Sequence, residues 1–215
     1  MRADLHTHSI YSDGELIPAE LVRRAKVLGH KAIAITDHVD MTNVEYVVTN
    51  VVRAAELSDD DITVIPGVEI THVPPSKMDQ VIADARRFGA KIIVVHGETI
   101  AEPVQEGTNR QAAMNPEVDV LAHPGFISEE EMQLAKDSGV MIEITGRKGH
   151  SLTNGYVAAL ARKVGATMVV DSDAHAPEDL MDQDAAYKVA LGAGLTIAEA
   201  DAAIQKAPFD LIGKL

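Results

Sequence analysis

The 215-residue sequence contains no cysteine and no tryptophan, and aromatic residues make up only 3% of it. The lack of cysteine excludes disulfide bonds, thiolate catalysis and cysteine-ligated zinc, and it is typical of a reducing cytoplasm. No apolar run approaches the roughly 20 residues that a membrane-spanning helix needs. Arg2 and Asp4 interrupt the start, where a signal peptide would lie. We therefore expect a cytoplasmic protein with no membrane segment and an aliphatic core.

Positive charge is also scarce. The chain has 19 lysines and arginines against 33 aspartates and glutamates, which gives a formal net charge of -14. Contacts to the phosphates of DNA or RNA depend on lysine and arginine. We therefore do not expect nucleic acid to be the main partner, and the acidity itself favours solubility.

Apolar runs with the character of β-strands alternate with segments of helical spacing. We predict seven strands, at Arg2–His8, Lys31–His38, Ile62–Thr71, Lys91–His96, Val118–His123, Val140–Thr145 and Ala166–Asp173. We predict helices at Ile17–Leu28, Asn43–Leu57, Met78–Phe88, Glu129–Ser138 and Tyr156–Val164, a loop with a short helix at Ala101–Asn115, and further helices after Glu178 and Thr196. Gly29, Gly89, Gly139 and Gly165 stand where C-terminal glycines of helices belong.

Strict alternation of strands and helices implies parallel strands joined by right-handed crossovers. An open sheet binds ligands at one switch point, whereas a barrel gathers residues from the C-terminal ends of many strands. Here all seven strands carry His, Asp or Glu at or just after that end. The pattern therefore favours one domain over residues 1–215, an α/β fold of the distorted (β/α)7, TIM-barrel-like kind.

The polar residues at the strand ends are types that bind Zn, Mn or Fe. Those that we single out at this stage are His6, His8, His38, His72, His96, His123, His175, Glu69, Glu98, Glu143, Asp171 and Asp173. Residues two apart in a strand share a face, so His6 and His8 point the same way. One rim carrying so many of these side chains predicts a multinuclear metal site and water-activating chemistry.

Several of these residues have plainer interpretations. Asp13, in Ser12-Asp13-Gly14, is either a turn former or a ligand folded back over the barrel mouth. His38 would ordinarily be a hydrogen-bonded core histidine, and His72 has the wrong parity relative to Glu69 and reads equally well as a loop residue. His30 follows a helix, where it would cap the helix dipole. It is the coincidence at all seven strand ends that indicates a site.

The motifs His6-Thr7-His8, Ser12-Asp13-Gly14, Thr36-Asp37-His38, Gly67-Val68-Glu69, His96-Gly97, Ala122-His123-Pro124 and Asp171-Ser172-Asp173-Ala174-His175 occur in this order. Together they resemble the PHP (polymerase and histidinol phosphatase) superfamily. The resemblance implies a seven-stranded barrel that hydrolyses phosphoesters with two to three divalent ions (Zn, Mn or Fe). It implies three ligand groups: His6, His8, Glu69 and Asp173; Glu69, His96 and His123; and Asp13, His38 and His175.

Some members of the superfamily carry His where this chain has Asp13. Asp4 and Asp171 are placed to accept hydrogen bonds from ligand imidazoles behind the metal site, and Glu143 receives no role.

The glycine-rich loop Gly146–Gly155 follows the sixth strand. It is either a solvated turn or a substrate loop, in which Arg147 and Lys148 hold phosphate oxygens and His150 protonates the leaving group.

The sequence therefore predicts a metal-dependent phosphoesterase that acts on a small phosphorylated substrate, with histidinol phosphate as a candidate by resemblance. A metal-bridged hydroxide would attack phosphorus, and the catalytic residues would be Glu69, His96, His123 and His150. Two alternatives are a proofreading-type nuclease and a non-catalytic metal-binding regulatory domain. The second is disfavoured because none of the nine predicted ligands is missing.

Overall fold

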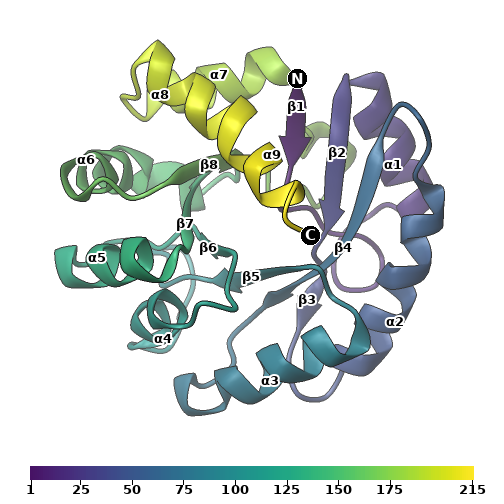
Figure 1. Ribbon diagram of the computed structural model, residues 1–215, viewed down its shortest axis with the longest axis horizontal. Helices are drawn as coiled ribbons and strands as arrows, with labels where there is room; N and C mark the ends of the chain where they lie inside the picture. Colours follow the sequence, from purple (N-terminus) through teal and green to yellow (C-terminus); the bar gives the residue numbers. More distant parts are fainter.

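The structure, a computed structural model that describes residues 1–215, confirms the predicted parallel α/β architecture (Figure 1). All strand pairs are parallel, and the main path runs β1-β2-β4-β5-β6-β7-β8, with β3 paired to β4. The strands are β1 (Arg2–Asp4), β2 (His30–Ile35), β3 (His38–Val39), β4 (Thr63–Ile70), β5 (Ile92–His96), β6 (Val120–Ala122), β7 (Met141–Thr145) and β8 (Met168–Asp171). The sheet curls into a nearly closed barrel, as a distorted TIM-barrel-like fold requires.

The helices surround this sheet (Figure 1). They are α1 (Pro18–Val27), α2 (Val44–Ala54), α3 (Pro75–Phe88), α4 (Thr108–Met114), α5 (Glu129–Ser138), α6 (Asn154–Val164), α7 (Gln183–Gly192), α8 (Ile197–Asp201) and α9 (Ala207–Ile212). Short 3-10 turns cover Ala55–Leu57, His150–Thr153 and Pro177–Asp179, and a π-helical turn covers Ala202–Lys206. Gly89, Gly139 and Gly165 adopt the left-handed conformation at helix C-termini, as predicted. None of the helices is both long and apolar enough to span a membrane.

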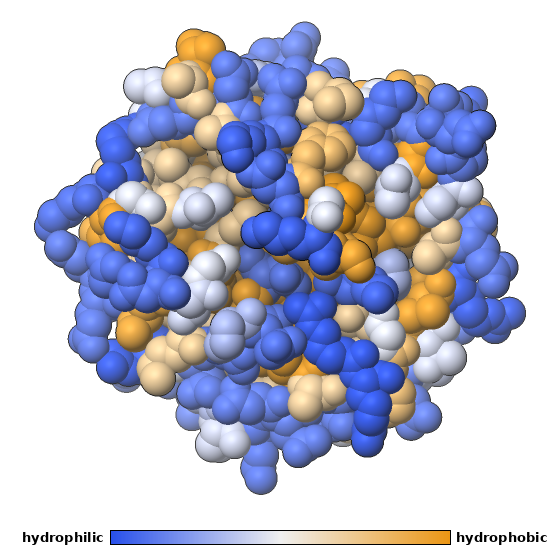
Figure 2. Space-filling model, viewed as in Figure 1, coloured by the Kyte–Doolittle hydropathy of each residue, from blue (hydrophilic) through white to orange (hydrophobic).

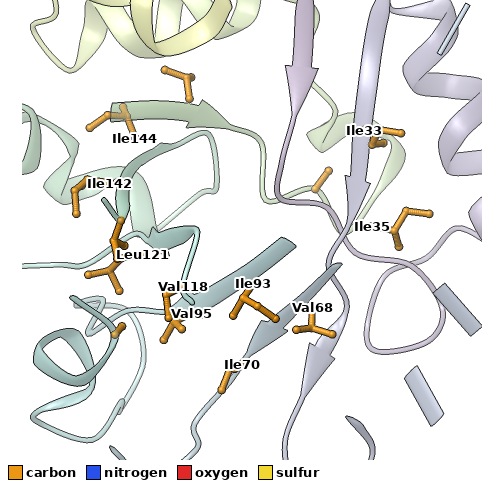
Figure 3. Packing of buried hydrophobic residues seen from close by; sticks show 14 of the residues in the cluster. Ile33, Ile35, Val68, Ile70, Ile93, Val95, Val118, Leu121, Ile142 and Ile144 are labelled. Atoms are coloured by element: carbon orange, nitrogen blue, oxygen red, sulfur yellow. The ribbon is translucent and has the colours of Figure 1, made fainter. Parts of the chain in front are cut away.

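Two aliphatic clusters hold the layers together. The larger lies between the strands and the helices, and Figure 3 shows its strand residues, among them Ile33, Ile93 and Ile142. The smaller fills the barrel with small and medium side chains such as Ala3, Ala34 and Val94. Helix α9 packs against this inner cluster and crosses the centre of the barrel in Figure 1. On the same face, Figure 2 shows hydrophilic residues at the edge and across the middle, with hydrophobic residues exposed between them.

The barrel has a seam between β1 and β8, where no regular ladder forms. The backbones meet in one bridge, Thr7 with Ala174, flanked by hydrogen bonds from His8 N to Ala174 O (2.9 Å) and from Asp173 N to His6 O (3.0 Å). The first predicted strand, Arg2–His8, is therefore regular only to Asp4. The predicted strand Lys31–His38 is likewise divided, because β2 ends at Ile35 and His38 begins β3.

Hydrogen bonds that involve buried polar side chains connect the β1 and β8 segments in place of the missing ladder. Arg2 donates to Val170 O at 2.6 Å, and Leu5 N donates to the Asp171 carboxylate at 2.8 Å. Ser172 N donates to Asp4 at 3.1 Å, and Arg2 pairs with the same aspartate at 2.9 Å. All of these side chains are buried. The prediction that Asp4 and Asp171 accept from ligand imidazoles is wrong, because these carboxylates accept from backbone amides and Arg2.

Candidate metal centre

The nine predicted ligands converge at the C-terminal ends of the strands. Five groups of side chains have ligand atoms that all lie within 4.8 Å of one another. They are His8, Asp13, His38 and His175; His6, His123 and Asp173; His6, His8 and Glu69; Glu69, His96 and His123; and His72, His96 and Glu102. The first four consist only of residues predicted from the sequence. Five of the nine ligands line a cavity of about 370 Å³, in which Val39 is the single hydrophobic lining residue: Asp13, His38, His96, Asp173 and His175. The other four are buried and do not line it.

Glu69 is the centre of the cluster and is fully buried at the end of β4. Its Oε1 lies 3.4 Å from His6 Nε2 and 3.5 Å from His123 Nε2. Its Oε2 lies 3.6 Å from His8 Nε2 and 2.8 Å from His38 Nδ1. Neither oxygen has a partner in hydrogen-bonding geometry. A buried carboxylate with no hydrogen bond is costly unless a cation binds it.

Most of the imidazoles are oriented with Nε2 toward the centre, whereas His38 directs Nδ1 toward Glu69 and Nε2 toward Asp13. Nδ1 of His6 donates to Glu143 at 2.9 Å, and Nδ1 of His96 donates to Gly97 O at 3.1 Å. Nδ1 of His175 donates to Asp173 O at 3.0 Å. Since each of these Nδ1 atoms is used as a donor, the lone pair of each Nε2 is directed into the cluster. Such outer contacts are what fix the tautomer of a metal-binding histidine.

The spacing of the facing atoms fits a coordination shell. Ligands about 2.0–2.2 Å from a tetrahedral ion lie about 3.3–3.6 Å from one another. Asp173 Oδ1 is 3.2 Å from His8 Nε2 and 3.7 Å from His6 Nε2, and Asp13 Oδ1 is 3.4 Å from His38 Nε2. The nitrogens of His6 and His8 face each other at 3.1 Å. The separations of these nitrogens and oxygens are close to those between ligands of one ion, so the residues present fit divalent cations.

The electrostatics of the cluster fit the same interpretation. Burial lowers the pKa of His38, but Glu69 and Asp13 outweigh this and raise it to about 10. Burial and the neighbouring His38 lower the pKa of His8 to about 3. Although burial acts to raise the pKa of Glu69, the imidazoles of His6, His38 and His96 hold it well below its usual value. The carboxylates thus stay ionised and some imidazoles carry protons, which incoming cations would displace.

Asp37 positions the loop that carries Asp13. The buried carboxylate accepts from Ser9 N at 2.8 Å and Ser9 Oγ at 2.7 Å. It also accepts from Ser12 N at 3.0 Å and Ser12 Oγ at 2.7 Å. The chain turns so tightly here that a Cβ on Gly14 would lie 2.5 Å from His8 O. The turn brings Asp13 to His38 and to His175, whose Nε2 is 3.2 Å away.

Glu143 acquires a role that the sequence did not assign. It is fully buried in β7, where one oxygen accepts from His6 Nδ1 and the other accepts from His123 N at 3.0 Å. One carboxylate thus orients two candidate ligands. The available signal was its position within an aliphatic strand, which requires a polar partner for the acid.

We expect Glu143→Gln to weaken divalent-metal binding about 10- to 100-fold while the fold is retained, since a glutamine cannot accept at both oxygens. Competition with a chelator of known affinity would measure the change. Glu106→Gln, which removes the same charge at an exposed position outside the cavity, would control for altered charge. Wild-type affinity in Glu143→Gln would show that the orientation of His6 and His123 does not depend on this acid.

Of the three predicted substrate residues in the loop after β7, two line the cavity and one does not. Arg147 lines the cavity and its Nη1 lies 3.1 Å from Asp179 Oδ2. Lys148 is exposed and does not line the cavity. His150 lines it, and its Nδ1 lies 2.7 Å from Thr99 Oγ1. Burial and the adjacent His123 lower the pKa of His150 to about 4, which favours the neutral imidazole near pH 7.

Two cavity residues were missed or undervalued. Glu102 lies in the loop between β5 and α4, a segment with no clear pattern, and contacts His72, His96 and His150. His72, interpreted equally well as a loop residue, lines the cavity.

His30 is not a helix cap: it is buried at the start of β2, with Nε2 2.8 Å from Met181 O. Glu98 lies outside the cluster and accepts from Asn109 N.

Comparison with known proteins identifies the family. The family model described as PHP domain matches residues 4–150. The chain belongs to the PHP domain family. An uncharacterized protein of Methanocaldococcus jannaschii is 50% identical over 218 residues, which is 100% of both chains. Ribonuclease P protein component 3 of Methanosarcina barkeri is 28% identical over 98% of this chain and 88% of its own length. A protein of Thermoanaerobacter sp. named Probable phosphatase is 27% identical over 90% of this chain and 86% of its own.

Solved structures confirm the fold of the PHP domain described here. A chain in archaeal ribonuclease P with mature tRNA superposes with a TM-score of 0.71 at 18% identity, over 98% of this chain and 90% of that one. Histidinol phosphate phosphatase from Lactococcus lactis, complexed with zinc, L-histidinol and phosphate, superposes with a TM-score of 0.62 at 15% identity. That match covers 91% of this chain and 94% of the other.

Proposed function

We propose that this chain is a metal-dependent phosphoesterase that hydrolyses small phosphomonoesters. The observation that carries the proposal is the convergence of nine ligand side chains, five of which line a polar cavity of about 370 Å³. A cavity of this size and polarity suits a small charged substrate. Two compared proteins, one named a phosphatase and one solved with zinc and phosphate, support the same chemistry.

The candidate ligands divide into an inner and an outer part. Glu69, His96 and His123 are buried, and of these only His96 lines the cavity. Asp13 also lines the cavity, with about half of its side chain exposed. Divalent cations bound there would supply Lewis acidity toward phosphate oxygens and lower the pKa of water. Glu69 directs one oxygen to His6 and His123 and the other to His8 and His38, so it belongs to more than one cation group.

The remaining cavity residues suit the substrate. Arg147 would hold phosphate oxygens, because a guanidinium binds them with two parallel hydrogen bonds. His150, which lies beside His123 with ring centres 4.3 Å apart, would contact the leaving group. Asp179, the partner of Arg147, also accepts from His175 N and Ala176 N. Arg147 is thus anchored to the segment that carries a candidate ligand.

The experiment that tests this function compares phosphomonoesters with phosphodiesters. Chelator-treated protein would be supplied with Zn, Mn or Fe and assayed on p-nitrophenyl phosphate, bis(p-nitrophenyl) phosphate and histidinol phosphate. We expect metal-dependent phosphate release with higher kcat/KM on the monoesters. Hydrolysis of diesters alone would instead support the nuclease alternative, and the absence of turnover with every metal would support a non-catalytic role.

We expect Arg147→Ala to lower kcat/KM on the best monoester by roughly one to two decades, through loss of a charge-assisted contact worth about 1.5–3 kcal/mol. Metal content should not change, because Arg147 belongs to none of the ligand groups. Lys148→Ala is the matched control, since it removes the same charge one residue away, outside the cavity. If the two variants have equal kinetics, the loop is a solvated turn with no part in substrate binding.

Similarity to ribonuclease P protein component 3 favours a second candidate, association with RNA. It opposes our expectation from composition, in which a net charge of -14 disfavours polyanions. Binding of tRNA measured at about 50 mM and 200 mM salt would decide between them, because contacts to phosphates weaken steeply with salt. Tight, salt-dependent binding would support an RNA-associated role.

A further inference from the structure

Backbone strain singles out one residue beyond the nine predicted ligands. Three non-glycine residues have positive φ angles: His72 at 52°, His123 at 29° and Asp173 at 52°. His123 and Asp173 are candidate ligands, and such strain persists at functional sites, where the surrounding structure maintains it. His72 is the third, and its imidazole lines the same cavity. Its conformation therefore points to a function.

His72 contacts a carboxylate that completes a further ligand group. Its Nε2 lies 3.1 Å from Glu102 Oε2, and the same oxygen lies 3.3 Å from His96 Nε2. The ligand atoms of all three residues are within 4.8 Å of one another. Two imidazoles and one carboxylate form a donor set that binds zinc, and these separations again match those between ligands of a tetrahedral ion.

This group shares His96 with the buried group of Glu69 and His123. Because His96 Nδ1 donates to Gly97 O, only Nε2 has a free lone pair, and that lone pair binds one cation at a time. The two groups differ in access to solvent. The side chains of His72 and Glu102 are 42% and 40% exposed, whereas those of Glu69 and His123 are at most 1% exposed. An ion that approaches from solvent meets the exposed group first.

We propose that His72, His96 and Glu102 form an outer capture site, from which a divalent ion passes to Glu69 and His123 through the shared His96. Bonds from the ion to His72 and Glu102 break as bonds to Glu69 and His123 form, and His96 stays bound throughout. The inference rests on the proposed function in one respect, namely that the buried group binds a divalent cation.

The test measures the rate of zinc uptake separately from the amount bound. Chelator-treated protein would be mixed rapidly with Zn²⁺ and a chromophoric zinc indicator, using the wild type, His72→Gln, Glu102→Gln and the control Glu106→Gln. Glu106 is an exposed acid of the same loop that does not line the cavity, so its variant removes the same charge without removing a ligand. Circular dichroism would verify that each variant is folded.

We expect His72→Gln and Glu102→Gln to take up zinc at least about tenfold more slowly than the wild type, while Glu106→Gln matches it. All four proteins should bind the same final number of ions. Wild-type uptake rates in His72→Gln and Glu102→Gln would overturn the capture site. It would also be overturned if these variants bound one ion fewer than the wild type, because His72 and Glu102 would then be permanent ligands of an ion. A wild type that binds no zinc would instead overturn the proposed function.

Discussion

Glu69→Gln is expected to remove at least one bound divalent ion per chain and to lower phosphomonoesterase turnover by about three decades or more. The carboxylate faces four histidines with two oxygens that have no hydrogen-bond partner. An amide keeps the shape of the side chain but replaces one oxygen with an NH₂ group, which cannot bind a cation. Elemental analysis after metal supplementation would count the ions, and phosphate release would give the turnover.

Thermal unfolding provides a second measure of the same change. A cation that binds only the folded state stabilises it, by about 4 kcal/mol at a free concentration 1,000 times the Kd. We therefore expect the wild-type Tm to fall on addition of chelator and the Tm of Glu69→Gln to fall much less. A Glu69→Gln protein with the full wild-type number of ions would contradict the central place given to this carboxylate.

His123→Ala is expected to abolish most turnover without unfolding the barrel. His123 follows β6, whose aliphatic side chains pack in both clusters, so the strand holds its position without the imidazole. The positive φ of 29° adds a smaller effect, because alanine tolerates this region less well than histidine. We expect a loss of stability of about 1 kcal/mol from that source, measurable by urea denaturation.

His123→Gly separates the two effects of this substitution. Glycine adopts positive φ readily, so it should recover part of the stability that His123→Ala loses while staying equally inactive. The far-ultraviolet circular dichroism of both variants should match that of the wild type. Turnover near the wild-type value in both variants, with full metal loading, would exclude His123 from the reaction.

The sequence predicts most of the metal centre because the patterns that locate its ligands lie within single strands. An unbroken aliphatic run that ends in a polar residue, such as Ile92–His96, places that residue at the rim of a parallel barrel. The two-residue period of a strand predicts that His6 and His8 face one ion. The helix Glu129–Ser138 also agrees with its predicted bounds, since a serine cap and a glycine mark its ends.

What the sequence could not predict depends on contacts between distant segments. Asp4 and Asp171 have the right parity for supporting ligands, yet they join the seam, which is visible only once β1 and β8 are side by side. Glu102 lies in a loop without periodicity, and three other elements bring histidines to it. Nothing in the sequence predicted that Asp37 accepts four hydrogen bonds that position the Asp13 turn.

The seam also links chemistry to the integrity of the fold. His6 and His8 lie on the β1 side of the gap, and Asp173 and His175 lie on the β8 side. A cation held by His6, His8 and Asp173 would therefore act as a cross-link between the first and last strands, at the one junction that lacks a backbone ladder. The ion that activates the reaction would also close the cylinder. Loss of the ion would then remove one of the links across this seam as well as stop the chemistry.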